Sequence, residues 1–323
     1  MGILETRFRR FIPFLLLGIV GVFLITACNS TPRQNMRSTV ESPGEACHVV
    51  QHKMGETCVP AEPKRIVTLS APTLNNALVL GVKPIASTYF YQDEVVSSLQ
   101  GKGIEFLGRS QPDLERMLLL KPDLILGWEV TGSEIYSLLS QIAPTVLGRW
   151  EGPLSWQEHF NFVAEVLGKT EAAQAAWSDY EQRVKQLKEA LGDRYQDQKV
   201  SFIHFGSRGI ESDVKNSFAG SILNEVGLQR SAAQDVTAPY GIISISEEEL
   251  LEKADGDILF ITTWTGDDQQ VLKRLQQKPL WQQLRAVQQN RLYFVSFPAW
   301  TGSSLLAAAA VIDDLYKYLI NTR

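Results

Sequence analysis

Tryptophan, tyrosine and arginine recur at predicted strand ends and in loops of this 323-residue chain. Large aromatic rings offer contact area to an organic ligand, and the planar guanidinium group of arginine makes paired, charge-assisted hydrogen bonds to carboxylate-like groups. Taken singly, each of these residues fits a core aromatic or a surface arginine equally well. Taken together, they favour a cleft for a bulky organic anion. The expected site residues are Tyr89, Arg109, Trp128, Arg208, Tyr240, Trp264 and Trp300.

The residues needed for other kinds of site are missing or scattered. Transition-metal sites cluster histidine with carboxylate or thiolate, but the four histidines, His48, His52, His159 and His204, are spread along the chain. No Gly-x-Ser-x-Gly, His-Glu-x-x-His or cysteine-nucleophile motif occurs. We therefore expect a binding protein without catalytic residues, resident metal or cofactor.

The N-terminus has the pattern of a secretion signal. Arg7, Arg9 and Arg10 precede the apolar run 11–25, and small residues lead to Cys28. The ending resembles a bacterial lipobox, which implies cleavage after residue 27 and lipidation of Cys28. The alternative is an uncleaved anchor, for which the 17 residues 11–27 barely reach a membrane-spanning length. Both interpretations place the rest of the chain outside the cytoplasm.

The charge of the exported part argues against nucleic acid as a partner. Residues 1–27 contain Glu5 and three arginines, so their removal changes the net charge from −5 to −7. An acidic chain without blocks of lysine and arginine lacks the electrostatic footprint of nucleic-acid binding.

Residues 28–62 are predicted to form a tether followed by a small hairpin. Up to Ala46 the composition is polar and flexible. Cys47 and Cys58 are expected to pair in an oxidising compartment. The alternative is a metal site made of these cysteines with His48 and His52, although its spacing fits no standard zinc pattern.

From Pro63 onward, apolar runs alternate with amphipathic segments, which is typical of α/β proteins with parallel sheets. A short helix is expected from Pro112 until Pro122 stops it, and Asp123–Leu126 reads as a buried strand. Strands are interrupted between Trp156 and Leu191, where apolar spacing predicts a long helix with a kink at Gly168. The expected division is an N-terminal lobe 63–155, an interlobe helix 156–192 and a C-terminal lobe 193–323.

The two lobes contain a similar order of residues. Glu115 is followed by Asp123 and Trp128, and Glu248 by Asp257 and Trp264. In each case an acidic helix leads to a buried strand that ends in tryptophan. Ligands of open parallel sheets gather at the carboxyl ends of the strands, so we expect the two tryptophans to face a shared cleft.

The chain from Pro63 to the end resembles the substrate-binding proteins of ATP-driven importers for ferric siderophores, whose superfamily also serves vitamin B12 and haem. The resemblance rests on several short motifs in order: Lys64–Ser70, Leu80–Pro84, Pro112–Glu115, Lys121–Ile125 and Pro279–Trp281. It implies two Rossmann-like lobes joined by one long rigid helix, with the ligand held between the lobes.

The resemblance also implies roles for single residues. Glu115 and Glu248 match acids that pair with arginines of the permease. Arg109, Tyr240 and Trp300 match ligand-facing positions, whereas Arg208 is supported by site chemistry alone.

The expected function is that of a lipid-anchored, monomeric receptor that passes a ferric siderophore to an ABC permease and its ATPase. Citrate, hydroxamate and catecholate ligands remain open, as does a cobalamin or haem cargo. A non-transport surface lipoprotein is a further alternative. An enzyme related to nitrogenase components would need cysteine ligands in the lobes, and none follows Cys58.

Overall fold

The computed structural model describes residues 47–89, 102–109, 111–206, 209–264 and 268–321. Residues Glu45–Arg323 form one compact unit. The predicted signal peptide, the lipidation site Cys28 and the ligand candidate Arg208 lie outside the described residues. None of the described helices combines the length and the apolar character needed to cross a bilayer.

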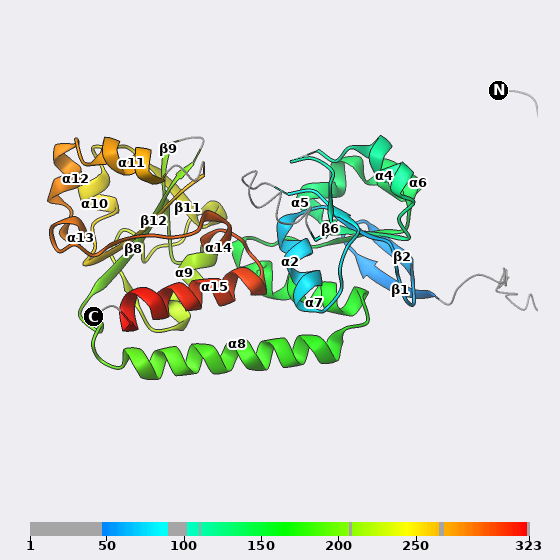
Figure 1. The fold of residues 1–323 in the computed structure, drawn as a ribbon, viewed down its shortest axis with the longest axis horizontal. Coiled ribbons are helices and arrows are strands. Elements are labelled where there is room, and N and C mark those ends of the chain that lie inside the picture. Colours follow the sequence, from blue (N-terminus) through cyan, green and yellow to red (C-terminus); the bar gives the residue numbers. More distant parts are fainter. Residues whose placement is uncertain (1–46, 90–101, 110, 207–208, 265–267, 322–323) are drawn as a thin grey trace, which may run out of the picture. The chain divides into compact units, whose positions relative to one another are not determined.

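A five-stranded parallel sheet forms the centre of the N-terminal half, as far as this half is described. The strand order is β5-β4-β3-β6-β7. Strand β6 of this sheet is labelled in Figure 1. Its central strands β3 and β6 are buried along their whole length, as expected for apolar runs covered on both faces. The strands are β3 Ile66–Thr68, β4 Ala86–Ser87, β5 Glu105–Phe106, β6 Leu124–Trp128 and β7 Thr145–Gly148.

Short helices connect these strands and begin at polar caps. The cap of α2 is Ser70, whose Oγ accepts a hydrogen bond from the Thr73 backbone N–H at 3.3 Å. Asp113 caps α4 through a 2.9 Å bond from the Arg116 N–H, and α4 ends at Lys121, where φ is 46°. The connecting helices are α2 Ala71–Val79, α4 Leu114–Leu120, α5 Glu129–Gly132, the 3-10 turn η1 Ser133–Ile135 and α6 Tyr136–Ile142.

The C-terminal half has a mixed sheet in its described part. Its strand order is β11-β9-β8-β12-β13, with β10 beside β8, and β9 is antiparallel to both of its neighbours. The sequence did not predict β9, which folds back along β8. The strands are β8 Lys199–Gly206, β9 Gly209–Asp213, β10 Gln229–Arg230, β11 Ile242–Ile245, β12 Ile258–Thr263 and β13 Leu292–Phe294.

Several helices of this half are short. The acidic helix expected at Glu248 is reduced to α10, so Glu248 lies in the turn before it. The closing helix α15 continues into one π-helical turn, Tyr316–Ile320. The helical elements are α9 Phe218–Glu225, η3 Pro239–Gly241, α10 Leu250–Lys253, α11 Asp268–Leu275, α12 Pro279–Gln283, α13 Arg285–Gln288, α14 Phe297–Trp300 and α15 Leu305–Leu315.

The helical segment between the two sheets is broken rather than continuous. After the turn η2, Pro153–Ser155, helix α7 covers Trp156–Val166. Gly168 then adopts a φ of 62°, and α8 runs from Thr170 to Leu191. The long helix of the prediction is therefore α8 alone, because the left-handed conformation at Gly168 ends α7.

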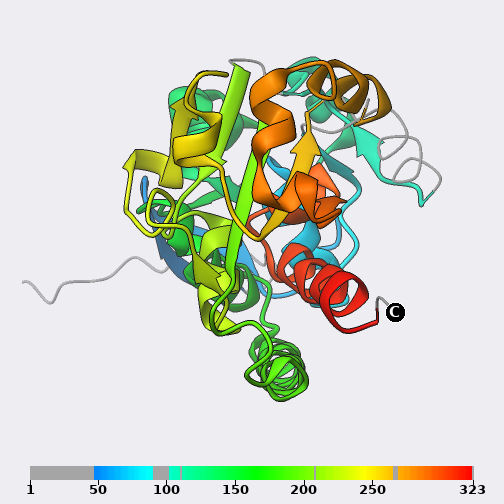
Figure 2. The same ribbon diagram turned by 90° about the vertical axis from the view of Figure 1, so that its left-hand side faces the viewer.

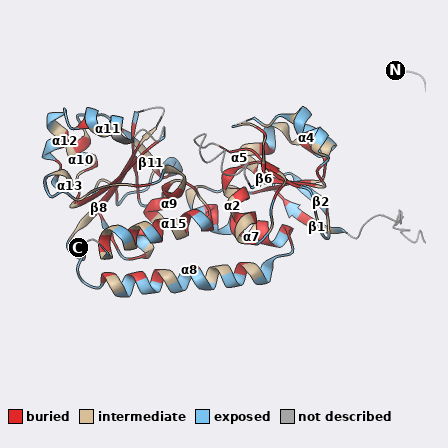
Figure 3. Ribbon diagram, viewed as in Figure 1, coloured by how far each residue is buried: buried red, intermediate tan, exposed pale blue. Residues whose placement is uncertain are grey.

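Helix α8 packs on α7 and α15 through one face (Figures 1 and 2). Its buried positions Ala173, Tyr180, Val184, Leu187 and Leu191 follow helical spacing, while its outer face is exposed (Figure 3). The core cluster that includes this face also contains Leu126 of β6 and Phe260 of β12. One hydrophobic core therefore joins the two sheets.

A disulfide-linked hairpin precedes the first sheet. Strands β1 Cys47–His52 and β2 Gly55–Pro60 pair antiparallel, and Cys47 is bonded to Cys58. Neither sulfur is thus available as a thiolate ligand, which removes the alternative of a metal site. The hairpin lies along β7, where the Lys53 N–H donates to the Leu147 carbonyl at 2.9 Å.

Candidate functional site

A cavity of about 750 Å³ lies at the carboxyl ends of strands from both sheets. Residues that follow β3, such as Ser70, line it together with Trp128 at the end of β6. The other sheet contributes Gly206 at the end of β8 and Trp264 after β12. The site therefore forms where parallel strands present their ends, in accordance with the general rule for open α/β sheets.

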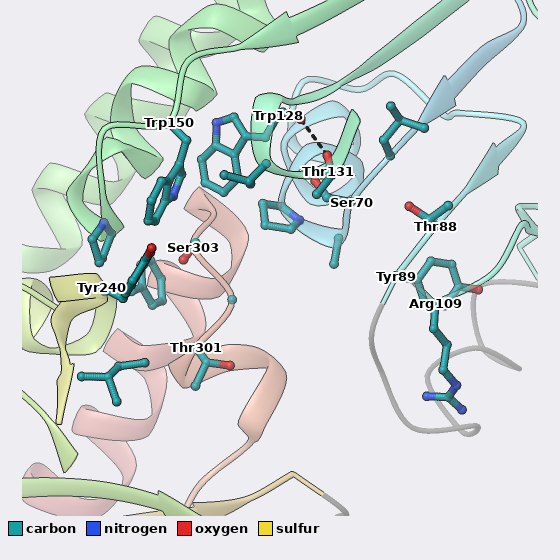
Figure 4. Close-up of a pocket in the computed structure, with 18 of the residues that line it drawn as sticks. Ser70, Thr88, Tyr89, Arg109, Trp128, Thr131, Trp150, Tyr240, Thr301 and Ser303 are labelled. Carbon is teal, nitrogen blue, oxygen red and sulfur yellow. Dashed lines mark hydrogen bonds between the residues drawn. The ribbon is translucent and has the colours of Figure 1, made fainter. Parts of the chain in front are cut away.

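Five of the predicted site residues line this cavity: Tyr89, Arg109, Trp128, Tyr240 and Trp264. Figure 4 shows Arg109 and Tyr89 on one side and Tyr240 on the opposite side, near Trp150. Residues from both halves of the chain, far apart in sequence, are thus brought to one site.

Trp300 is not at the cavity wall, which corrects the sequence-based expectation. Its side chain is fully buried, packs against Phe202 and Phe260, and donates from Nε1 to Asp314 Oδ2 at 2.9 Å. The cavity is lined instead by the following residues, Thr301, Gly302 and Ser303. The sequence match located the correct segment, but helix α14 places the Trp300 side chain in the core.

Exposed aromatic rings form part of the wall. Tyr240 is 68% exposed and stacks on Trp150, with ring centroids 5.6 Å apart and an interplanar angle of 18°. Trp264 is 40% exposed and meets Phe297 edge-on at 5.2 Å. Such rings offer flat apolar surface to a ligand. Trp150, which lies in a loop after β7, was not among the residues expected from the sequence.

The backbone around Tyr240 is held in an uncommon conformation. Tyr240 has a φ of 58°, and Gly241 follows with a φ of 70°. A Cβ atom at Gly241 would lie 2.5 Å from the Cα of Ser217, so only glycine allows this close approach. The two residues together hold the tyrosine ring out over the cavity.

Trp128 is a buried part of the cavity wall. Its ring packs against that of His159 in a tilted arrangement, with centroids 4.1 Å apart and an interplanar angle of 40°. The Nε2 atom of His159 is hydrogen-bonded to Thr73 Oγ1 at 2.9 Å, and burial lowers the pKa of His159 to about 3. The imidazole is therefore neutral. Within the described chain, neither Trp128 Nε1 nor His159 Nδ1 has a hydrogen-bond partner.

The opposite wall contains a cluster of charged side chains that the sequence did not reveal. His204 of β8 lies between two acids of β9: its Nδ1 is 2.7 Å from Asp213 Oδ2, and its Nε2 is 2.8 Å from Glu211 Oε2. All three side chains are buried. Burial would lower the pKa of His204, but hydrogen bonds and charge attraction from the two carboxylates outweigh it and raise the pKa to about 9.

Strand register brings this cluster together. His204 lies directly opposite Glu211 in the antiparallel pair β8–β9, and Asp213 is on the same face two residues later. Gly206 leaves room for the carboxylate, since a Cβ atom there would lie 2.7 Å from Glu211 Oε2. The only signal in the sequence was the alternation Gly-Ile-Glu-Ser-Asp over 209–213.

The two acids expected to contact a permease are separate from the cavity. Glu115 is exposed on α4, beside Leu118 and Leu119, which are 58% and 80% exposed. Glu248 is exposed in the turn before α10. Neither lines the cavity.

The described lining offers ring surface and hydrogen-bonding groups to a ligand. Over the described ranges, no group of three or more His, Cys, Asp or Glu side chains is placed to hold a metal ion. Rings, one guanidinium group and a buried charged cluster surround a space of ligand size.

Comparison with known proteins places the chain among binding proteins of transport systems. Residues 66–299 match the family model described as periplasmic binding protein. The probable siderophore-binding lipoprotein YfiY of Bacillus subtilis is 28% identical over 333 aligned residues, which cover 98% of this chain and all of YfiY. The Fe(3+)-citrate-binding protein YfmC of the same organism is 25% identical and covers 97% of this chain.

A solved structure supports the same assignment. Staphylococcus aureus SirA complexed with staphyloferrin B has a TM-score of 0.71 and 25% sequence identity. The match covers 84% of this chain and 98% of SirA. On the strength of the family model and the shared fold, this chain belongs to the periplasmic binding protein family.

Proposed function

We propose that this chain is an extracytoplasmic receptor that captures a ferric siderophore in the cavity and delivers it to an ABC permease. The observation that carries the proposal is the aromatic-lined cavity of about 750 Å³ at the strand ends of both sheets, a volume suited to a drug-sized ligand. The similarity to the probable siderophore-binding YfiY, to the Fe(3+)-citrate-binding YfmC and to SirA, whose structure contains staphyloferrin B, supports it.

Binding of an iron chelate explains the kind of residues at the site. A siderophore already surrounds Fe(III) with oxygen ligands, so the protein has to hold only the outside of the complex. Tyr240, Trp150 and Trp264 would contact carbon, and Arg109 would donate hydrogen bonds to ligand oxygens. The receptor carries out no catalysis in this proposal, and iron is its cargo.

The rest of the transport role extends the proposal to the surface and the N-terminus. A lipid on Cys28 would anchor a monomeric receptor to the membrane, and Glu115 and Glu248 would contact the permease, which couples to its ATPase. The exposed Leu118 and Leu119 beside Glu115 support this, because apolar side chains next to a charge are suited to a protein contact.

The binding site is tested by Arg109→Ala. We expect ferric-siderophore affinity to fall by about 1–3 kcal/mol, the size of a lost charge-assisted hydrogen bond. Quenching of tryptophan fluorescence during titration measures it. Arg116→Ala is the matched control, because Arg116 is exposed on α4, pairs with Glu105 and does not line the cavity. Unchanged affinity for Arg109→Ala removes this arginine from the site. Absorption spectra with cobalamin and haem test the alternative cargoes.

The docking role is tested by Glu115→Lys and Glu248→Lys. Each variant should bind the ferric complex normally but support less iron uptake by cells, because reversed charge opposes the permease arginines. Glu181→Lys on the exposed face of α8 supplies the control for a charge reversal elsewhere. Normal uptake by both docking variants would contradict the role of these acids.

A further inference from the structure

A chain of hydrogen bonds runs from the cavity wall into the buried interior. Ser70, the cap of α2, lines the cavity (Figure 4) and is 9% exposed. Its Oγ lies 2.8 Å from Oγ1 of Thr73, and that oxygen lies 2.9 Å from Nε2 of His159. Each hydroxyl group has one hydrogen to donate. The direction of donation along the chain therefore depends on which nitrogen of His159 carries the proton.

The surroundings of His159 favour a proton on Nε2. The imidazole is neutral, so one of its nitrogens donates and the other accepts. Within the described chain, Nδ1 has no hydrogen-bond partner. A Cβ atom at Gly148 would lie 2.9 Å from Nδ1, so a Cα–H bond of this glycine lies beside the nitrogen. A lone pair accepts a weak contact from such a group, whereas a buried N–H would lack an acceptor there.

With the proton on Nε2, the direction of each hydrogen bond follows. The imidazole donates to Thr73 Oγ1, so the Thr73 hydroxyl directs its own hydrogen to Ser70 Oγ. Ser70 Oγ then accepts two hydrogen bonds, one from this hydroxyl and one from the Thr73 backbone N–H at 3.3 Å. Among the described residues, no acceptor is left for the Ser70 hydrogen, and its hydroxyl is at the cavity wall. A proton on Nδ1 would reverse the chain, and Ser70 would donate to Thr73.

We infer that the Ser70 hydroxyl donates a hydrogen bond to an oxygen atom of the bound ligand, and that Thr73 and His159 are positioning residues for this donor. The inference rests on the proposed function and adds a contact to it. Carboxylate, hydroxamate and catecholate groups around Fe(III) all carry oxygen atoms that accept hydrogen bonds. A donor whose direction is already fixed loses little freedom when the ligand binds, which favours affinity. Beside α2, the site therefore prefers a ligand that presents an acceptor.

The contact is tested by Ser70→Ala. The probes are ferric citrate, ferrioxamine B and ferric enterobactin, which represent carboxylate, hydroxamate and catecholate complexes. Quenching of tryptophan fluorescence identifies the probe that the unaltered receptor binds most tightly. For that probe, Ser70→Ala should weaken binding about three- to tenfold, the effect of losing one neutral hydrogen bond.

Ser304→Ala is the matched control, because Ser70→Ala also removes the cap of a helix. Ser304 caps α15 by accepting a 3.2 Å bond from the Ala307 N–H; it is buried and does not line the cavity. Its loss should change affinity less than about twofold. Unchanged affinity for Ser70→Ala, or equal losses in the two variants, overturns the inference and leaves the proposed function in place. Binding of none of the probes to the unaltered receptor overturns the proposed function, and the inference with it.

The protonation of His159 tests the positioning role without any ligand. Nitrogen-15 NMR of the unliganded receptor distinguishes a protonated ring nitrogen from a bare one, and His159→Gln identifies the signals of this residue by their loss. We expect the proton on Nε2 at neutral pH. A proton on Nδ1 overturns the inference, because the Ser70 hydroxyl would then donate to Thr73. Thermal unfolding checks that each variant is folded, and this measurement on the unaltered receptor still tests the inference if Ser70→Ala is not.

Discussion

Two buried histidines, His159 and His204, lie on opposite sides of the cavity, and their pKa values are shifted in opposite directions. Both are almost inaccessible, at 1% and 4% exposure. His159 has a hydroxyl partner and an indole ring beside it, and its pKa falls to about 3. His204 has two carboxylate partners, and its pKa rises to about 9. Burial penalises the charged form of each, and the neighbours decide which form is present.

The difference divides the cavity surroundings into a neutral side and an ionic side. On the neutral side, the folded state is stabilised when the His159 imidazole is unprotonated. On the ionic side, it is stabilised when the His204 imidazole is protonated. Stability should therefore decline in opposite pH directions for the two histidines, which makes the comparison measurable.

The largest effect is expected in acid and comes from His159. Its pKa is lower in the folded state than in the unfolded state, so its contribution is present above pH 6.5 and is lost as pH falls toward 3. The free energy of unfolding should fall by about 4–5 kcal/mol over this pH range because of His159. Urea unfolding at a series of pH values should show a shallower acid decline for His159→Gln than for the unaltered protein. Identical acid slopes would show that His159 is not held neutral by burial.

A somewhat smaller effect is expected in alkali and comes from His204. Its pKa is higher in the folded state than in the unfolded state, so its contribution to the free energy of unfolding is fully present below pH 6.5 and is lost as pH rises through 9. The loss is about 3 kcal/mol. Asp213→Asn removes one carboxylate and should flatten the alkaline decline in the same unfolding experiment. Asp235→Asn serves as control, because Asp235 forms an exposed ion pair with Lys215. An alkaline slope that Asp213→Asn leaves unaltered would break the contrast between the two histidines.

The smallest effect is expected from Thr73→Val. This change keeps the volume of the side chain but removes the hydroxyl bonded to His159 Nε2. We expect a loss of about 1–2 kcal/mol in the free energy of unfolding, the cost of leaving a buried polar atom without a partner. The loss should be independent of pH between about 6 and 8, because the imidazole stays neutral there. A loss confined to low pH would mean that Thr73 acts on the charged form instead.

The sequence was sufficient for the elements that depend on local pattern. Short apolar runs located β6 and the strand before Trp264, β12, and the spacing of Tyr180, Val184 and Leu187 located the buried face of α8. Gly168 was correctly singled out, although the conformation there breaks the helix instead of bending it.

The parts that escaped prediction depend on tertiary structure. Strand β9 contains Glu211, Ser212 and Asp213, a polar run that reads as a loop until β8 and β11 pair with it. Trp150 becomes a site residue only through its stacking on Tyr240, 90 positions later in the numbering. Cross-strand partners of this kind leave no periodic signal in a single sequence.

The similarity in sequence between the two halves predicts where a residue lies but not how exposed it is. Trp128 and Trp264 were expected to have equivalent positions, and both line the cavity. Trp128 is nevertheless buried against His159, whereas Trp264 is 40% exposed. Matching strand ends thus locate a residue at the site but do not determine how much of its ring a ligand can reach.

The hairpin at the start of the described chain has a consequence for self-association. Strand β7 is the last strand of its sheet, and an uncovered edge of this kind can pair with another molecule. The hairpin occupies that edge: Thr57 Oγ1 donates to the Thr145 carbonyl at 3.1 Å, and the Leu147 N–H donates to His52 Nδ1 at 3.3 Å. The disulfide holds the two strands of this cover together. Its reduction should therefore increase aggregation at high protein concentration before it affects the distant cavity.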